Sequence, residues 1–164
     1  MRQKEISLGT YYHLIQMKNK KYNIAIVISD FNRSISEGLL SGAKKAFNDN
    51  NGHSIKVYRV PGAFEIPATV KKVADKLKPD AIITLGSIIK GETKHFDFIA
   101  AECTRAIQNL TSEYDFPILF GVLTTNNKRQ AIARSSTNNK GYEVMNAAFE
   151  MINLFKEIEK SSKF

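Results

Sequence analysis

The sequence predicts a three-layer αβα sandwich, in which a mainly parallel, four-stranded sheet is covered by helices on both faces. Four apolar runs have the length and composition of β-strands, and segments with apolar residues at helical spacing separate them. Strands that alternate with helices are typical of βαβ units, whose strands run parallel. The alternation continues along most of the chain, so one fold of this class accounts for it.

The apolar runs divide into central strands and an edge strand. In chain order they are YNIAIVIS (22–29), HSIKVYRV (53–60), DAIITLGS (80–87) and FPILFGVLT (116–124). The first and third are almost continuously apolar, as expected for strands that are buried on both faces. The second alternates apolar and polar positions, so we expect it nearer an edge of the sheet. The segment YYHLIQM (11–17) is predicted to be a further strand that adds to a neighbouring subunit.

Four amphipathic helices are predicted between and after these strands, with a shorter helix at about 128–134 before the last. Pro67 falls in the first turn of the second helix, where proline is tolerated, and Pro79 follows its end. Cys103 lies on the apolar stripe of the third helix, which favours buried packing over a reactive thiol. The stripes are Ile35, Leu39, Ala43 and Phe47; Val70, Val73 and Leu77; Ile99, Cys103, Ala106 or Ile107, and Leu110; and Val144, Ala148, Met151, Phe155 and Ile158.

Length and cysteine content set the domain organisation and the compartment that we expect. The 164 residues suit an N-terminal arm (1–21), a single α/β domain (22–160) and a tail (161–164). Cys103 is the only cysteine, which excludes a disulfide within the chain and indicates a reducing, cytoplasmic setting. No apolar run approaches the ~20 residues that span a bilayer, and the first residues lack the apolar core of a signal peptide. We therefore expect no membrane partner.

The formal net charge of +8 has two interpretations. Clustered lysines bind nucleic acids by displacing counterions, but here the lysines fall on separate predicted elements, without a basic helix or an aromatic-basic pattern. A solvated basic surface is therefore favoured, and no nucleic-acid partner is expected. Such a surface favours anionic small substrates.

Ligands of parallel sheets bind at the carboxyl ends of the strands, so the loops at that edge are the candidate site. They are SDFNRS (29–34), VPGAFEIP (60–67), GSIIKGETKHFD (86–97) and TTNNK (124–128). In the third loop, Gly91 permits backbone angles that let 91–93 curl around an oxyanion. His95 exchanges protons near neutral pH, and Asp97 is placed to orient its ring. The alternative is a plain loop that happens to contain a histidine.

The second loop offers an aromatic side chain beside a carboxylate, Phe64 and Glu65, which suits a flat heterocycle that carries hydroxyl groups. The alternative is a strand-to-helix turn, with Phe64 in the core and Glu65 near the start of a helix. Phe31 and Asn32, in the first loop, form a second aromatic-plus-amide pair at the same edge.

Five motifs together resemble the lumazine synthase family: VPGAFEIP, GSIIKGETKHFDF, FGVLTT, QAIAR and NKG, in this order. The resemblance extends from Tyr22 to the end of the last predicted helix. It implies a flavodoxin-like sheet and a transferase of riboflavin biosynthesis. The implied reaction condenses 5-amino-6-(D-ribitylamino)uracil with 3,4-dihydroxy-2-butanone 4-phosphate to 6,7-dimethyl-8-ribityllumazine. It releases phosphate and water and uses no cofactor or metal.

The resemblance also implies roles for individual residues. Phe31 stacks on the pyrimidine, and His95 transfers protons. The pyrimidine edge and ribityl chain are held by Ala63, Phe64, Glu65 and the backbone of Ser87, Ile88 and Ile89. The phosphate is held by Glu92, Thr93 and Arg134. Phe120 and Lys140 match family positions that reach the pocket of an adjacent subunit.

The implied assembly is a homo-oligomer, a pentamer or a sixty-subunit capsid, with active sites between subunits and riboflavin synthase as a candidate partner. Two features depart from the family pattern. Asn126 and Arg129 replace residues that are usually acidic, and RSSTNNKG (134–141) is shorter than the common version. The second departure bears on the size of the assembly, because in the family the connection between these two helices influences whether a pentamer or a capsid forms.

Alternatives remain at this point. Each of three residues has an alternative role outside the site. Arg134 could pair with surface carboxylates, Lys140 could be a routine residue at a helix start, and Phe120 could be part of the core. A flavin-binding or shell-forming relative with little catalysis is the alternative function, although a shell needs none of the reactive residues. A flavodoxin-like nucleotide binder has the same fold class, but the first loop lacks a glycine-rich phosphate cradle.

Overall fold

The computed structural model describes residues 21–161, which form a four-stranded, all-parallel sheet with helices on both faces. The predicted strand in 11–17 lies outside the described residues. The sheet order is β2-β1-β3-β4. In chain order the elements are β1 (Asn23–Ser29), α2 (Arg33–Asp49), β2 (Ser54–Val60), the 3-10 helix η1 (Ala63–Glu65), α3 (Ile66–Leu77), β3 (Ala81–Ile89), α4 (His95–Thr111), β4 (Ile118–Thr125), α5 (Lys128–Ser135) and α6 (Lys140–Lys160).

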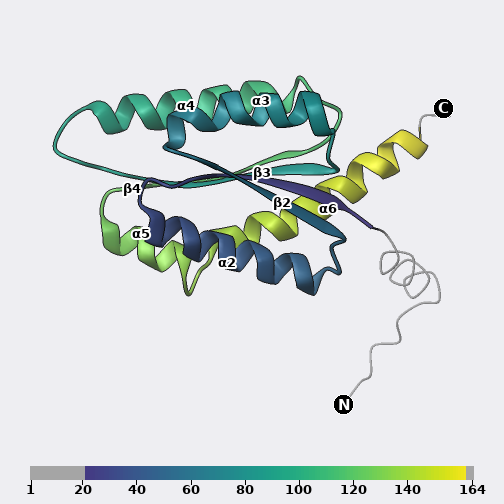
Figure 1. The fold of residues 1–164 in the computed structure, drawn as a ribbon, viewed down its shortest axis with the longest axis horizontal. Helices are drawn as coiled ribbons and strands as arrows, with labels where there is room; N and C mark the ends of the chain where they lie inside the picture. Colours follow the sequence, from purple (N-terminus) through teal and green to yellow (C-terminus); the bar gives the residue numbers. More distant parts are fainter. Residues whose placement is uncertain (1–20, 162–164) are drawn as a thin grey trace, which may run out of the picture.

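Two separate cores lie on the two faces of the sheet. Figure 1 shows α3 and α4 over one face and α2, α5 and α6 over the other. Alternate residues of β1 serve the two cores: Ile26 packs with the α2 and α6 residues, and Val27 packs with those of α3 and α4. Each such buried side chain stabilises the fold by about 1.5–3 kcal/mol. The continuous apolar runs of the sequence therefore reflect burial on both faces, and the predicted sandwich is confirmed.

The edge position of β2 is also as predicted, because it pairs only with β1 in this sheet. The bounds predicted for the loop at 86–97 are wrong at both ends, because the connection in the structure is shorter. Strand β3 continues to Ile89, which pairs with Thr125, and α4 begins at His95, so only residues 90–94 connect them. The apolar, β-branched Ile88 and Ile89 prolong the strand, and the chain leaves it only beyond them.

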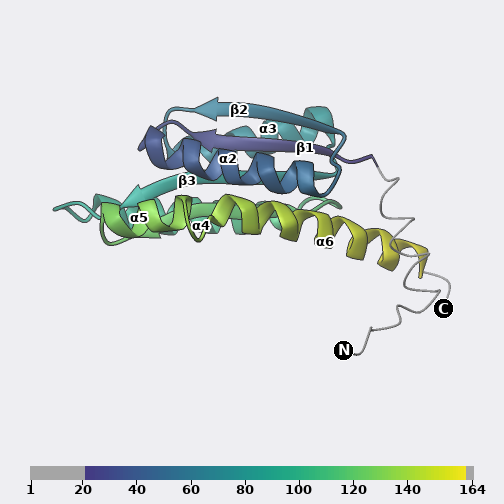
Figure 2. The same cartoon turned by 90° about the horizontal axis from the view of Figure 1, so that it is seen from below.

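The predicted burial of the apolar stripe is confirmed in α2. It is wrong at the C-terminal ends of α3 and α6. Ile35, Leu39, Ala43 and Phe47 are all buried. Leu77 and Ile158 are exposed, although both fit the apolar spacing. The last turns of α6 extend beyond the sheet in Figure 2, so the cores of the described residues do not reach them.

Cys103 is buried in the core beside α3, as predicted. Burial raises the pKa of its thiol to about 11, so the nucleophilic thiolate is scarce at neutral pH. Within residues 21–161, no helix has the length and apolar character needed to cross a membrane.

Gly141→Ala is expected to destabilise the protein. Gly141 lies in the first turn of α6, where a methyl group would come within 1.9 Å of the Leu39 carbonyl oxygen of α2. Overpacking against backbone costs about 1–3 kcal/mol, which outweighs the better helix propensity of alanine. Thermal unfolding should show a midpoint lowered by roughly 2–12 °C, since 1 kcal/mol shifts the midpoint by about 2–4 °C in a domain of this size.

Gly91→Ala is the matched control, because no atom of the described chain lies within 4 Å of the position that the added methyl group would take. Its midpoint should stay near that of the wild type. Equal midpoints for the two variants would show that the α2–α6 contact adapts to a methyl group without loss.

Candidate active site

A cavity of about 620 Å³ opens at the carboxyl edge of the sheet. It lies where the chain, having run from β1 out to β2, crosses back to β3, which is the position at which ligands of open α/β sheets bind. Its wall comprises Phe31, Gly62, Ala63, Phe64, Glu65, Ser87, Ile88, Ile89, Gly91, Thr93, His95, Phe96 and Ile99. Three of the four predicted loops contribute, whereas 124–128 gives no residue to this wall.

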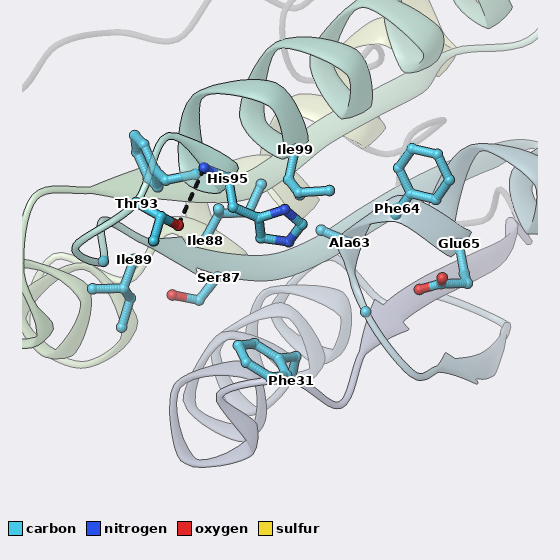
Figure 3. A pocket seen from close by; sticks show the side chains of 13 residues that line it. Phe31, Ala63, Phe64, Glu65, Ser87, Ile88, Ile89, Thr93, His95 and Ile99 are labelled. Atoms are coloured by element: carbon cyan, nitrogen blue, oxygen red, sulfur yellow. Dashed lines mark hydrogen bonds between the residues drawn. The ribbon is translucent and has the colours of Figure 1, made fainter.

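His95 is the first residue of α4, and Figure 3 shows its ring directed into the cavity, toward Ala63. Its backbone N–H donates to Thr93 Oγ1 at 3.4 Å, which holds the start of the helix against the preceding turn. The expected contact from Asp97 is absent, because among the described residues no hydrogen bond joins its carboxylate to the ring. The imidazole is therefore free to face a ligand.

The turn before α4, at the edge of the cavity, contains backbone donors that are unpaired among the described residues, and it forms without a left-handed glycine. Gly91 does not have a positive φ, so the predicted use of its conformational freedom is wrong. Within the described chain, the N–H groups of Thr93, Lys94 and Phe96 donate no hydrogen bond to other protein atoms. Such groups at the start of a 17-residue helix, together with its dipole, form an anion-binding position.

Two aromatic side chains stand exposed at the cavity. Phe31 is 69% and Phe64 62% exposed, so the alternative that placed Phe64 in the core is wrong. Ala63, beside it, is buried in the core under α3. The short η1 turn thus buries its alanine and leaves its phenylalanine outside. Figure 3 shows Phe31 and Phe64 reaching the cavity from different segments, with His95 beside it. Exposed apolar ring faces of this kind suit a flat ligand.

The end of β3 provides polar groups deep in the cavity. The pairing of β1 with β3 stops at Leu85, whereas β4 continues alongside β3 to Ile89. One side of 86–89 therefore lacks a strand partner and faces the cavity. The Ser87 carbonyl accepts a hydrogen bond from Asn32 Nδ2 at 2.9 Å, but Ser87 Oγ is buried and has no partner among the described residues. A buried hydroxyl without a partner is costly unless a ligand or water completes it.

Four of the residues to which the resemblance gives roles do not line this cavity: Glu92, Phe120, Arg134 and Lys140. Arg134 and Lys140 instead meet at one carboxylate, Glu143, at 3.6 Å and 3.0 Å. They belong to α5 and α6, which cover the opposite face of the sheet from α4 (Figure 1). Phe120 is 36% exposed on the edge strand β4.

Phe96 and Ile99 line the cavity although sequence reasoning missed Phe96 and assigned Ile99 only to the helix core. Ile99 follows His95 by four residues, so it shares the side of α4 on which His95 lies, and Phe96 adjoins His95 in the first turn of the helix. The sequence could have indicated these two residues only if the start of the helix at His95 had been known. The described residues contain no group of three or more His, Cys, Asp or Glu side chains placed to hold a metal ion.

The fold and the cavity define an α/β enzyme that acts on small molecules. Residues 21–156 match the sequence profile of 6,7-dimethyl-8-ribityllumazine synthase. A protein of that name from Nautilia profundicola is 45% identical over 148 residues, which cover 88% of this chain and 96% of the relative. Another from Chlorobium phaeovibrioides is 50% identical over 137 residues, which cover 81% and 88%.

The chain therefore belongs to the 6,7-dimethyl-8-ribityllumazine synthase family. Its function is the condensation of 5-amino-6-(D-ribitylamino)uracil with 3,4-dihydroxy-2-butanone 4-phosphate in riboflavin biosynthesis. The interpretation as a flavin-binding or shell-forming protein with little catalysis is not favoured.

Proposed function

We propose that the condensation takes place in the cavity beside His95, and that an adjacent copy of the chain completes this site. One observation carries the proposal: among the described residues no lysine or arginine lines the cavity, yet one substrate is a phosphate ester. A buried phosphate needs paired positive charge, and an arginine fork is well suited to supply it. In this proposal the cation lies on the adjacent copy.

The uracil substrate occupies the aromatic side of the cavity. Phe31 stacks on the pyrimidine, and Ala63, Phe64 and Glu65 hold its edge and the ribityl chain, where a carboxylate accepts hydrogen bonds from hydroxyl groups. The backbone of Ser87, Ile88 and Ile89 supplies further contacts. The unpaired side of β3 and the partnerless Ser87 hydroxyl in the described chain support this placement.

The phosphate of the second substrate lies at the start of α4. Glu92 and Thr93 form the turn that receives it, mainly through backbone N–H groups, and the Thr93 hydroxyl also faces the cavity. These groups and the helix dipole favour an anion there. The phosphate is both a handle for binding and a leaving group, so the same contacts stabilise the departing ion.

His95 transfers the protons that the reaction moves. The amine attacks the ketone, water and phosphate leave, and the ring closes, and each stage gains or loses a proton. The His95 ring faces the space between the proposed ring and phosphate positions. Holding both reactants in one cavity replaces a bimolecular encounter by a nearly unimolecular step.

The adjacent copy supplies Phe120, Arg134 and Lys140. All three lie outside the cavity wall, and Arg134 and Lys140 share one surface because both pair with Glu143; these positions support the assignment. We propose a homo-oligomer with sites between subunits, either a pentamer or a capsid of pentamers. The free thiol of Cys103 suits work in the cytoplasm.

Phe31→Ala tests the assigned ring position. Alanine substitution of an aromatic residue that stacks on a base costs about 1–3 kcal/mol, so the Kd for the uracil substrate should rise roughly tenfold or more. Calorimetric titration with that substrate alone measures the change. The second substrate should keep its KM within about twofold, because Phe31 belongs to the β1–α2 connection and not to the turn that is proposed to hold the phosphate.

Phe98→Ala is the control, since Phe98 is 65% exposed and lies outside the cavity wall. Its Kd should match the wild type. If both variants bind the uracil substrate with wild-type affinity, the ring does not stack on Phe31 and the proposed placement fails.

A further inference from the structure

The position of Phe31 is not set by burial. It lies in the three-residue connection between β1 and α2, and its side chain is mostly exposed. An exposed ring takes its place from the backbone that carries it. The contacts of residues 30–32 therefore determine the position of the Phe31 ring, which is the proposed stacking surface.

On one side, this connection is tied to β3. Asn32 adopts the left-handed conformation, with φ 58° and ψ 46°, which asparagine tolerates better than most residues. Its side-chain amide donates to the Ser87 carbonyl at 2.9 Å. Phe31 therefore precedes a residue whose backbone and side chain are both fixed.

On the other side, the connection is tied to β2 and the segment that follows it. The Asp30 and Phe31 N–H groups donate to the Val60 and Pro61 carbonyls at 2.8 Å and 3.0 Å. The Arg59 guanidinium adds a fork: Nη1 reaches Asp30 Oδ1 at 2.8 Å, and Nη2 reaches Glu37 Oε1 at 2.8 Å.

Arg59 thus joins three elements around the aromatic side of the cavity. It precedes by one residue Val60, after which 61–65 carry Phe64 and Glu65 to the cavity wall. Through Asp30 it holds the residue next to Phe31, and through Glu37 it holds the second turn of α2. One planar guanidinium therefore connects the segments that bear the two exposed rings, a task for which a single ammonium is too small.

We propose that Arg59 is a positioning residue for the ring-binding wall: its fork to Asp30 and Glu37 sets the spacing between Phe31 and the segment that bears Phe64. The alternative is an ordinary surface ion pair, because the Arg59 side chain is 35% exposed and such pairs typically contribute about 0–1 kcal/mol. The two differ in what they affect. A surface pair alters stability slightly, whereas a positioning residue alters affinity for one substrate. The inference rests on the proposed role of Phe31.

The test measures binding of 5-amino-6-(D-ribitylamino)uracil alone to the intact assembly by calorimetry. Arg59→Gln should raise the Kd about threefold to tenfold, since the two backbone hydrogen bonds remain and the loop is loosened rather than released. The KM for the phosphate substrate and kcat should stay within about twofold of wild type. Arg59→Lys should give an intermediate Kd, because it keeps the charge and loses one of the two contacts.

Arg33→Gln is the matched control. Arg33 pairs with the same Glu37, at 3.7 Å, but is not paired with Asp30, so the Kd should not change. If Arg59→Gln does not fold, Asp30→Asn removes one carboxylate of the fork with little change in shape, and it should raise the Kd in the same direction.

Two results would overturn the inference. One is a Kd for Arg59→Gln, or for Asp30→Asn in its place, equal to that of Arg33→Gln. The other is an equal loss for both substrates together with a lowered thermal midpoint, as a general structural role requires. Phe31→Ala, measured in parallel, separates this failure from that of the proposed function: if it weakens binding while Arg59→Gln does not, only the inference is wrong.

Discussion

A mixture of His95→Ala and Arg134→Ala subunits is expected to be much more active than either variant alone. If each site takes its imidazole from one chain and its guanidinium from the next, random mixing places both intact residues in about a quarter of the sites of a closed ring. Each variant by itself has only defective sites. The measurement is formation of the lumazine chromophore after the two variants are unfolded, mixed and reassembled.

The physical basis is the separation of the two residues within one chain. His95 begins α4 over one face of the sheet, and Arg134 lies on α5 over the other, paired with Glu143. The double variant, mixed with wild type at the same ratio, is the control for reassembly. If the mixture of single variants is no more active than their average, His95 and Arg134 belong to one chain's site or to none, and the shared site is wrong.

His95→Ala alone should lower kcat by about a hundredfold to ten-thousandfold, the usual contribution of a general acid or base. Turnover should not vanish, because positioning of the two substrates remains and supplies much of the acceleration. Binding of the uracil substrate should change little. Steady-state turnover at saturating concentrations of both substrates measures the effect.

His53→Ala is the matched histidine control, since His53 is exposed in the turn before β2 and is absent from the cavity wall. It should retain wild-type turnover. A His95→Ala enzyme with the same kcat as His53→Ala would show that another group, or water, transfers the protons.

Much of the candidate site could be predicted from sequence because of where the strands end. Phe31, Ala63–Glu65, Ser87–Ile89 and His95 all follow or end parallel strands, and the carboxyl ends of such strands share one edge. The prediction for the conformation of the turn before α4 was wrong. Gly91 was expected to adopt a special conformation, but the turn at 90–94 is short enough to be made without a positive φ.

The placement of Arg134 could not be predicted in the same way. The motif QAIAR indicates a functional arginine, but it does not say which cavity the side chain reaches. In the chain, α5 follows β4 and packs against α2, so Arg134 lies over the face opposite α4. In the proposed site such a residue reaches the anion position from a second copy, and no periodicity within one chain encodes that.

The sequence by itself determined the parallel sheet, the edge position of β2, the set of segments at the carboxyl edge and the family. The sheet, the edge strand and the segments at the carboxyl edge follow from local composition and periodicity, which report how each element is buried, whereas the family follows from the resemblance of the five motifs. Only the tertiary structure decided that Phe31, Phe64 and His95 share one cavity while Arg134 lies apart from it. Distances between side chains on different elements depend on strand order and on the face that each helix covers, and these are properties of the packed chain as a whole.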